Sequence, residues 1–350
     1  MTQSSKSPVV DVHSHLYPNL YIDLLRDRTE VPCVRSNPDT NELRLVNRAG
    51  ENGKPMTPLL YDISTKIAFM DEHGIDISVL SLGNPWLDFL PSETAGDVAK
   101  TINDSTNELC KTYPGRLFFF AALPLSAPTN VIVAEIFRLQ AASHVRGIIL
   151  GPGGLGEGLD DEKLVPVFQA AEEICMPVFL HPHHGLPSSV WGPCCGSYGQ
   201  VPAVSLGFPM ETTIGLVRMI LAGIFEKVPN LQIIVSHAGG TLPFLAGRIE
   251  SCIEHDRVLA AEGKLKSDRR TVWDILKNNL YLNSVIFDKI GLKAAIEASG
   301  VDRVMFGTDH PLFPPASVKT NVKAVGDTSG GTDEYDMIMG GNAARVLRLF

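Results

Sequence analysis

The sequence predicts an α/β protein that folds as a closed (β/α)8 barrel of the TIM type. Two observations predict this fold: short apolar strands alternate with helical segments along most of the chain, and eight such strands fit within its 350 residues. Strands that alternate with helices are parallel and are joined by right-handed crossovers. We therefore expect residues 1–350 to form one domain in which the C-terminal ends of all strands open onto one face, where catalytic residues gather.

The first predicted strand is the apolar run at 8–10, which leads into Asp11-Val12-His13-Ser14-His15. Side chains alternate between the two faces of an extended chain, so His13 and His15 point the same way, about 6.5–7 Å apart along the strand. One divalent metal ion can bind both rings. A lone pair of this kind also arises often in surface loops, so a metal site requires further ligands elsewhere in the chain.

Residues 17–61 form a long stretch that is rich in Pro, Asn, Arg and Gly, and we expect it to be irregular. Loops of this length in a compact domain are usually functional lids or disordered. Its arginines are candidates for holding a carboxylate, although most surface arginines have no such role: Arg26, Arg28, Arg35, Arg44 and Arg48.

After this loop, strands and helices alternate to the end of the chain. We expect strands at 75–82, 117–122, 145–150, 177–180, 232–235, 280–283 and 304–306. We expect helices at 62–73, 92–113, 128–142, 161–174, 209–226, 241–261, 288–299 and 335–349. A second long loop, 183–208, follows the fifth strand. The glycine-rich segment 151–156 lacks both the Lys-Ser/Thr of a P-loop and the spacing of a dinucleotide fingerprint, which indicates a plain barrel loop.

The composition argues against several classes of protein. The formal net charge is -9 and the 30 Lys and Arg residues are scattered, which gives no electrostatic footprint for nucleic acid. No uninterrupted apolar run approaches the roughly 20 residues that span a bilayer, and the polar start at 1–6 lacks an apolar signal segment. We expect a cytoplasmic protein without a membrane partner. The six cysteines, including the adjacent pair Cys194-Cys195, form neither a disulfide framework nor a zinc motif.

Candidate metal ligands follow the predicted strands. They are His13 and His15 on strand one, His181 after strand five, His237 after strand six and Asp309 after strand eight. A single histidine at a strand end is usually structural, but five groups in equivalent positions are hard to explain in that way. Three neutral imidazoles and a carboxylate suit zinc or a similar divalent ion and leave room for substrate. The loop residues His183 and His184 are weaker candidates, and His73, His144 and His255 lie away from strand ends.

Four segments together make the resemblance to a known family specific. They are Asp11-Val12-His13-Ser14-His15, Val178-Phe179-Leu180-His181-Pro182, Ser236-His237-Ala238-Gly239-Gly240 with Gly247-Arg248-Ile249, and Gly307-Thr308-Asp309-His310-Pro311. The chain resembles the aminocarboxymuconate-semialdehyde decarboxylase family, a branch of the amidohydrolase superfamily, from residue 8 to the last helix. Within that branch, Leu82-Gly83-Asn84-Pro85-Trp86 and Gly207-Phe208-Pro209 resemble the fungal uracil-5-carboxylate (isoorotate) decarboxylases.

The resemblance implies one zinc ion held by His13, His15, His181 and Asp309, with His237 beside it as a catalytic or polarising group. It also implies that Arg248 reaches into the site of a neighbouring subunit to bind carboxylate, which requires a homodimer or a larger homo-oligomer. Asn84 and Phe208 are our candidates for contacts to the substrate ring, with simple packing as the alternative. Family members usually lack both long loops, so the substrate cannot be carried over from the family.

The chemistry that follows is the loss of carbon dioxide from a carboxylated aromatic or pyrimidine ring. Direct loss leaves an sp2 carbanion that no neighbour delocalises, whereas protonating the ring carbon first avoids it. We therefore expect a Lewis acid for the carboxylate and the adjacent oxygen, Asp309 as proton donor and His237 assisting by hydrogen bonding. The predicted substrate is uracil-5-carboxylate. Salicylate-type acids, hydrolysis of an amide or lactone at the same metal, and a metal-binding barrel without catalysis are the alternatives.

Overall fold

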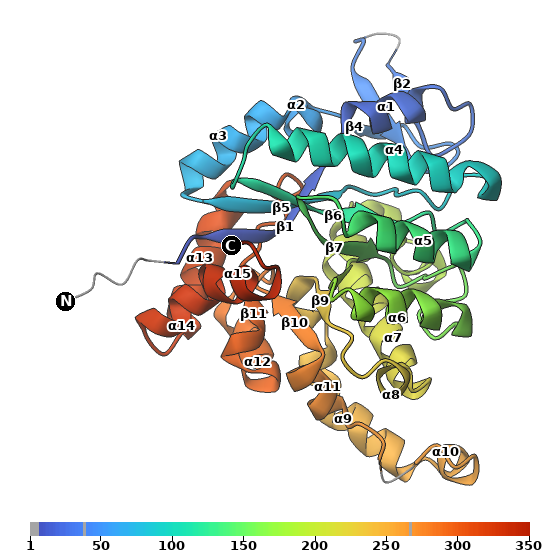
Figure 1. The fold of residues 1–350 in the computed structure, drawn as a ribbon, viewed down its shortest axis with the longest axis vertical. Helices are drawn as coiled ribbons and strands as arrows, with labels where there is room; N and C mark the ends of the chain where they lie inside the picture. The colour runs from blue at the N-terminus through green and yellow to red at the C-terminus, as the bar shows by residue number, and fades with distance from the viewer. Residues whose placement is uncertain (1–6, 38–39, 266–267) are drawn as a thin grey trace.

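The computed structural model describes residues 7–37, 40–265 and 268–350, and within them eight parallel strands curve into a nearly closed barrel (Figure 1). Their order around the sheet is β1 (Val10–Leu16), β5 (Ile77–Leu82), β6 (Leu117–Ala122), β7 (Val145–Leu150), β8 (Val178–Leu180), β9 (Ile233–Val235), β10 (Leu280–Asn283) and β11 (Val304–Met305). The barrel closes where the backbone N–H of Asp309 donates to the carbonyl of His13 (2.7 Å) and that of His15 donates to the carbonyl of His310 (2.8 Å). The predicted (β/α)8 barrel is confirmed.

Helices pack around the outside of this barrel, mostly one after each strand (Figure 1). They are α3 (Ile63–His73), α4 (Ser92–Lys111), α5 (Thr129–Leu139), α6 (Val165–Glu173), α7 (Phe208–Leu221), α9 (Leu242–His255), α11 (Val272–Asn278), α12 (Lys289–Ser299) and α13 (Ala316–Thr328). The sequence pattern does not predict α11 and α13. Neither segment has apolar residues repeating at helical spacing over its whole length, and α13 begins just after a proline-rich turn.

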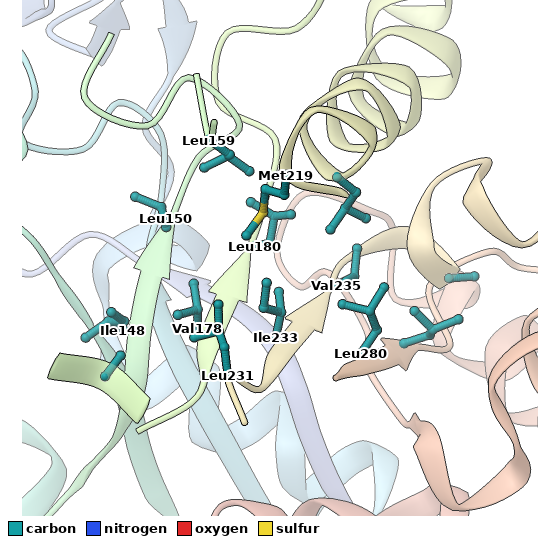
Figure 2. Close-up of a cluster of buried hydrophobic side chains, with 14 of the residues drawn as sticks. Ile148, Leu150, Leu159, Val178, Leu180, Met219, Leu231, Ile233, Val235 and Leu280 are labelled. Atoms are coloured by element: carbon teal, nitrogen blue, oxygen red, sulfur yellow. The ribbon is translucent and has the colours of Figure 1, made fainter. Parts of the chain in front are cut away.

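Alternating strand residues divide the core into two layers. Outward-facing side chains such as Val178 and Leu180 of β8 and Ile233 and Val235 of β9 pack with Met219 of α7 (Figure 2). The intervening side chains fill the barrel interior, among them Phe120, Phe179, Ile234 and Tyr281. Both faces of each strand are buried, which is why the strands read as continuous apolar runs. The interior layer supports the polar residues at the mouth of the barrel.

The stretch 17–61 is more regular than we predicted. It contains α1 (Asn19–Arg26), an antiparallel sheet of β2 (Cys33–Ser36), β3 (Leu43–Val46) and β4 (Lys54–Pro55), and α2 (Pro58–Tyr61). The sheet is held by pairing between β2 and β3 and by the burial of Cys33, Val34 and Leu45. The prediction of an irregular loop was wrong because the strands are so short that their turn residues dominate the composition.

Three other predicted boundaries change. β1 runs from Val10 to Leu16, one residue past His15, so the two histidines that we expected at the end of the first strand lie within it. The helix expected at 209–226 is divided into α7 and α8 (Ile224–Lys227) at Gly223, whose φ of 69° interrupts the helix. The last helix is α14 (Thr332–Asp336), a π-helical turn at Met337–Gly341 and α15 (Asn342–Val346), while α10 (Arg257–Ala261) follows α9.

One helical stretch, Pro202–Leu221, is long and apolar enough to cross a membrane by length and composition alone. It combines a π-helical segment with α7 and carries Glu211 and Arg218. Leu216 and Met219 pack into the outer core layer, which identifies α7 as a covering helix of the barrel. The predicted polar start at 1–6 and the side chain of Cys195 lie outside what the structure describes, and the cytoplasmic location stays a prediction.

Candidate metal centre

Four predicted ligands converge at the mouth of the barrel: one ligand atom from each of His13, His15, His181 and Asp309 lies within 4.8 Å of the others. The Nε2 atoms of His13 and His15 are 3.2 Å apart, and Oδ1 of Asp309 lies 3.4 Å and 3.2 Å from them. Two ligand atoms that share one tetrahedral ion at about 2.0–2.1 Å lie roughly 3.3–3.4 Å apart. The separations of these buried groups therefore match those of ligands around a common ion.

Hydrogen bonds orient two of the imidazoles toward this centre. Nδ1 of His181 is 2.7 Å from the carbonyl of Pro182, which only accepts, so Nδ1 carries the proton and the lone pair lies on Nε2. Nδ1 of His15 lies 3.0 Å from Oγ of Ser81, whose hydroxyl donates to a backbone carbonyl and therefore accepts from the ring. Such hydrogen bonds on the far ring nitrogen are typical of metal-ligating histidines.

The charges in the cluster favour a bound cation. Burial lowers the pKa of His13 and of His181 well below the ordinary value, so both rings are neutral. Burial alone would raise the pKa of Asp309, but interactions with His13, His15 and His237 hold it well below its usual range. Oδ1 of Asp309 has no hydrogen-bond partner among the described residues. A buried carboxylate oxygen without a partner is costly, so the donor set fits a divalent ion.

Unusual backbone conformations place the two predicted catalytic groups. Asp309 has a φ of 57° and His237 a φ of 53°, both in the left-handed region that residues other than glycine rarely adopt. These conformations turn the side chains back over the barrel after β11 and β9, and Nε2 of His237 comes within 3.5 Å of Oδ2 of Asp309. Gly240, with a φ of 65°, closes the His237 turn, and a Cβ there would lie 2.4 Å from the carbonyl oxygen of Pro209.

Asp11 joins β1 to the segment that carries Asp309. Its carboxylate accepts from the backbone N–H groups of His13 and Thr308, each at 3.0 Å, and from the Thr308 hydroxyl at 2.6 Å. Burial raises the pKa of Asp11 to about 6, against the opposing effect of these hydrogen bonds. Asn283, the last residue of β10, places its side-chain amide 2.9 Å from Nδ1 of His13. These residues fix the ligand pair on β1.

A fully buried lysine adds further contacts between β1 and the segment that carries Asp309. The ammonium of Lys66, from α3, contacts the hydroxyl of Ser14 and both Nδ1 and the carbonyl of His310. Burial lowers the pKa of Lys66 to about 7, although Asp11 and Asp309 oppose the shift. The ring of His310 stacks on Phe69 with centroids 3.7 Å apart. Lys66 therefore joins the residue between the β1 ligands to the residue after Asp309.

These supporting residues are not among the site residues predicted from the sequence. Asn283 could have been found, because it ends an apolar strand in the same way as the predicted ligands do. Lys66 could not, because a lysine within an amphipathic helix normally faces solvent and nothing local marks it as buried.

The three predicted substrate contacts lie in different settings. The amide nitrogen of Asn84 donates to the carbonyls of Pro182 and His183 (3.1 and 3.3 Å). Phe208 begins α7 and lies against the loop at Gly185. Arg248 is exposed on α9 and makes no hydrogen bond or ion pair with another described residue. The structure thus places Asn84 and Phe208 around the loop that follows His181, and Arg248 on the surface of this chain.

His183 and His184, the weaker candidates, do not belong to the four-residue cluster, but they contact another acid. Nε2 of His183 lies 3.1 and 3.2 Å from the two carboxylate oxygens of Asp88, and Nε2 of His184 lies 3.5 Å from one of them.

Comparison with known proteins gives a family and close structural relatives. The model of the family described as amidohydrolase matches residues 10–349. The crystal structure of IDCase (isoorotate decarboxylase) from Metarhizium anisopliae in apo form shares 50% identity with this chain, has a TM-score of 0.95, and is matched over 100% of this chain and 99% of its own.

More distant relatives are similar over nearly the whole length. The 2-amino-3-carboxymuconate-6-semialdehyde decarboxylase of Dictyostelium discoideum is 25% identical over 98% of this chain and 92% of its own length. A dihydroxybenzoic acid decarboxylase from Polaromonas sp. JS666, solved with bound manganese and 2-nitroresorcinol, is 23% identical with a TM-score of 0.76, covering 98% of this chain and 97% of its own. The latter likeness supports the fold.

Proposed function

Because this chain belongs to the amidohydrolase family, we propose that its strand-end cluster is the active site of a metal-dependent, non-oxidative decarboxylase of carboxylated rings. The relatives reported above are named as decarboxylases, which favours carbon dioxide release over hydrolysis of an amide or lactone. The observation that carries the substrate assignment is the 50% identity to IDCase over the whole chain. On that basis the substrate is uracil-5-carboxylate, and the product is uracil.

His13, His15, His181 and Asp309 are the residues that would hold a divalent ion. Such an ion supplies a Lewis acid for the substrate carboxylate and the neighbouring ring oxygen. Zinc is the ion predicted from the sequence and is our proposal; the same ligand types also bind manganese. The manganese of the Polaromonas enzyme makes metal identity a matter for elemental analysis.

Asp309 is the proposed proton donor to the ring carbon. Its pKa lies well below the usual value, so the carboxylate is ionised before substrate binds and must acquire the proton that it delivers. His237 is placed to pass that proton, because its Nε2 lies 3.5 Å from Oδ2 of Asp309, the oxygen that faces away from the β1 ligands. Protonation makes the ring carbon tetrahedral, and loss of carbon dioxide then restores conjugation.

Substrate binding draws on loops and on a second subunit. We assign ring contacts to Asn84 and Phe208, which flank the loop after His181. We assign carboxylate binding to Arg248 of a neighbouring copy, because the side chain is exposed in this chain. Phe244, one helical turn earlier on α9, is 84% exposed. A large exposed aromatic beside an unpaired cation is typical of an interface, which supports a homo-oligomer.

A substrate panel tests this function. The metal-loaded protein is assayed for carbon dioxide release from 5-carboxyuracil, 2,6-dihydroxybenzoate, 6-methylsalicylate and aminocarboxymuconate semialdehyde. We expect the highest kcat/KM with 5-carboxyuracil. Preference for a hydroxybenzoate would select the salicylate-type alternative. Absence of carbon dioxide from all four, together with oxygen-18 from water in the product of an amide or lactone, would establish the hydrolase instead.

A further inference from the structure

Three metal-ligating side chains form a second cluster beside Trp86. Asp88 lies in the loop between β5 and α4, and His183 and His184 lie in the loop after β8; one ligand atom from each is within 4.8 Å of the others. The ring of Trp86 stacks on His183 with centroids 4.4 Å apart and meets the edge of His181 at 6.1 Å. The second cluster therefore neighbours the metal centre but shares none of its ligands.

Hydrogen bonding fixes which nitrogen of His183 faces Asp88. The NH2 group of Asn84 must face the carbonyls of Pro182 and His183, because carbonyls only accept. The amide oxygen of Asn84 then faces Nδ1 of His183 at 3.3 Å, so Nδ1 carries a proton and donates it. In the tautomer with this proton alone, the lone pair lies on Nε2 and is aimed at both oxygens of Asp88. A lone pair and a carboxylate that face each other need a cation between them.

The distances in the cluster favour a metal ion over a shared proton. Charge-assisted N–H···O bonds are about 2.7–2.9 Å long. Here Nε2 of His183 is 3.1 and 3.2 Å from the Asp88 oxygens, nearly equidistant, and Nε2 of His184 is 3.5 Å away. Ligand atoms around one tetrahedral ion are separated by roughly 3.3–3.4 Å. These separations are longer than strong hydrogen bonds and bracket the ligand spacing.

The loop that carries the two histidines is held in place. The carboxylate of Glu211, in the first turn of α7, accepts from three successive backbone N–H groups at 2.9–3.1 Å, those of His183, His184 and Gly185. The side chain of His183 is only 7% exposed, whereas those of Asp88 and His184 are 34% and 67% exposed. An ion could thus enter from solvent, and water would complete its coordination.

We propose that Asp88, His183 and His184 bind a second divalent transition-metal ion of the zinc type, which fastens the loop after β5 to the loop after β8. Two imidazoles and a carboxylate suit zinc, cobalt or nickel, whereas magnesium and calcium prefer all-oxygen sites. Both loops border the barrel mouth, and Asn84 belongs to the first of them. The second ion would accordingly stiffen the entrance that the substrate uses.

The test counts metal ions per chain. The full-length protein is stripped with a chelator and dialysed against a buffered series of free Co²⁺ concentrations, and bound cobalt is measured by elemental analysis and by its d–d absorption. We expect two ions per wild-type chain and one in Asp88→Asn. Asp309→Asn, which damages the first centre, should also retain one. The matched control Asp97→Asn, an exposed acid of α4 that belongs to neither of the two described ligand clusters, should bind two.

A second variant guards against misfolding. His184→Ala removes a largely exposed ring, and we expect it to weaken the second Co²⁺ ion at least about tenfold while the first is unchanged. Equal cobalt binding by wild type, Asp88→Asn and His184→Ala would overturn the proposal. The cluster would then be held by hydrogen bonds between the histidines and Asp88 alone. If only the first centre, at His13, His15, His181 and Asp309, does not bind metal, the result is distinguishable. Wild type would then bind one Co²⁺ ion per chain and Asp88→Asn would bind none.

Discussion

Asp309 has two proposed roles, that of a metal ligand and that of a proton donor. Oδ1 faces the β1 histidines, while Oδ2 faces His237. As a ligand the carboxylate must be ionised, and as a proton donor it must accept and release a proton during each turnover. Because the two oxygens face different groups, Oδ1 is available to bind the metal ion and Oδ2 to carry the proton.

Asp309→Asn is the substitution that tests this dual role. The amide keeps the size of the side chain but carries no charge and cannot deliver a carboxyl proton. We expect carbon dioxide release to fall by at least roughly 10³-fold, given that positioned acids contribute about 10²–10⁴. The matched control is Asp327→Asn, which removes an acid paired with Lys323 on α13. Carbon dioxide release at the wild-type rate would disprove the assignment.

Lys66 makes the pH dependence of stability informative. Its pKa falls from 10.5 to about 7 on folding, chiefly through burial. Between these values the unfolded chain binds a proton that the folded chain does not, so the free energy of unfolding should rise with pH from about 7 to about 10. In Lys66→Met that contribution disappears. Urea unfolding across this pH range should therefore show that the free energy of unfolding of wild type increases relative to that of the variant as pH rises.

The exposed Lys100 of α4 provides the comparison for this experiment. Lys100→Met should follow the wild-type pH curve closely. Parallel curves for wild type and Lys66→Met would show that Lys66 keeps its ordinary ionisation in the fold.

At the residue scale, the sequence predicts those site residues that have a recognisable position relative to an apolar strand. His13, His15, His181 and Asp309 lie on or directly after apolar strands, and the structure brings all four together. Lys66 and Asp88 have no such signal, because their surroundings come from elements distant in the sequence. Their environment depends on tertiary packing, which local pattern does not record.

At the element scale, α9 carries the exposed residue, Arg248, for which we propose a role in a neighbouring subunit's site. Phe244 and Arg248 lie one turn apart on it, and side chains spaced by four residues share a face. If Arg248 serves a neighbouring site, a subunit that lacks it can be rescued by a partner that retains it. The oligomer can therefore be tested through activity rather than size alone.

Mixing two inactive variants provides that test. Arg248→Met keeps its own Asp309, and Asp309→Asn keeps Arg248, so a mixed dimer contains one complete site. We expect each variant alone to be nearly inactive, and a co-refolded equimolar mixture to recover about a quarter of the wild-type activity for random pairing. A mixture no more active than its components would show that Arg248 acts within its own chain or not at all.

Element prediction succeeded where strands are buried and failed where they are short. Runs such as 117–122 and 280–283 match β6 and β10 residue for residue, because both faces of these strands are apolar. The strands β2 to β4 have four residues or fewer, and turn-forming residues between them hide the pattern. Pairing with a neighbouring strand, rather than periodicity, defines this small sheet.

At the scale of the whole molecule, the candidate metal ligands join distant parts of the barrel. They come from β1 and from the ends of β8 and β11, so the groups that we propose as ligands also span the closure between the first and last strands. The sequence predicts this arrangement through the strand order, but not the identity of the metal, because imidazole and carboxylate ligands serve several divalent ions. Ion binding and barrel stability should therefore be coupled.

Removal of the metal should lower Tm. A ligand that binds only the folded state at 100 times its Kd stabilises by about 2.7 kcal/mol, and an ionised, unpartnered Asp309 oxygen adds to the cost of the stripped site. Calorimetry of chelator-treated and reloaded protein, both in the Asp88→Asn background to exclude the second cluster, should show the higher Tm after reloading with Zn²⁺ or Mn²⁺. Asp309→Asn in that background should lose most of this shift. An equal shift without Asp309 would mean that the stabilising ion binds elsewhere.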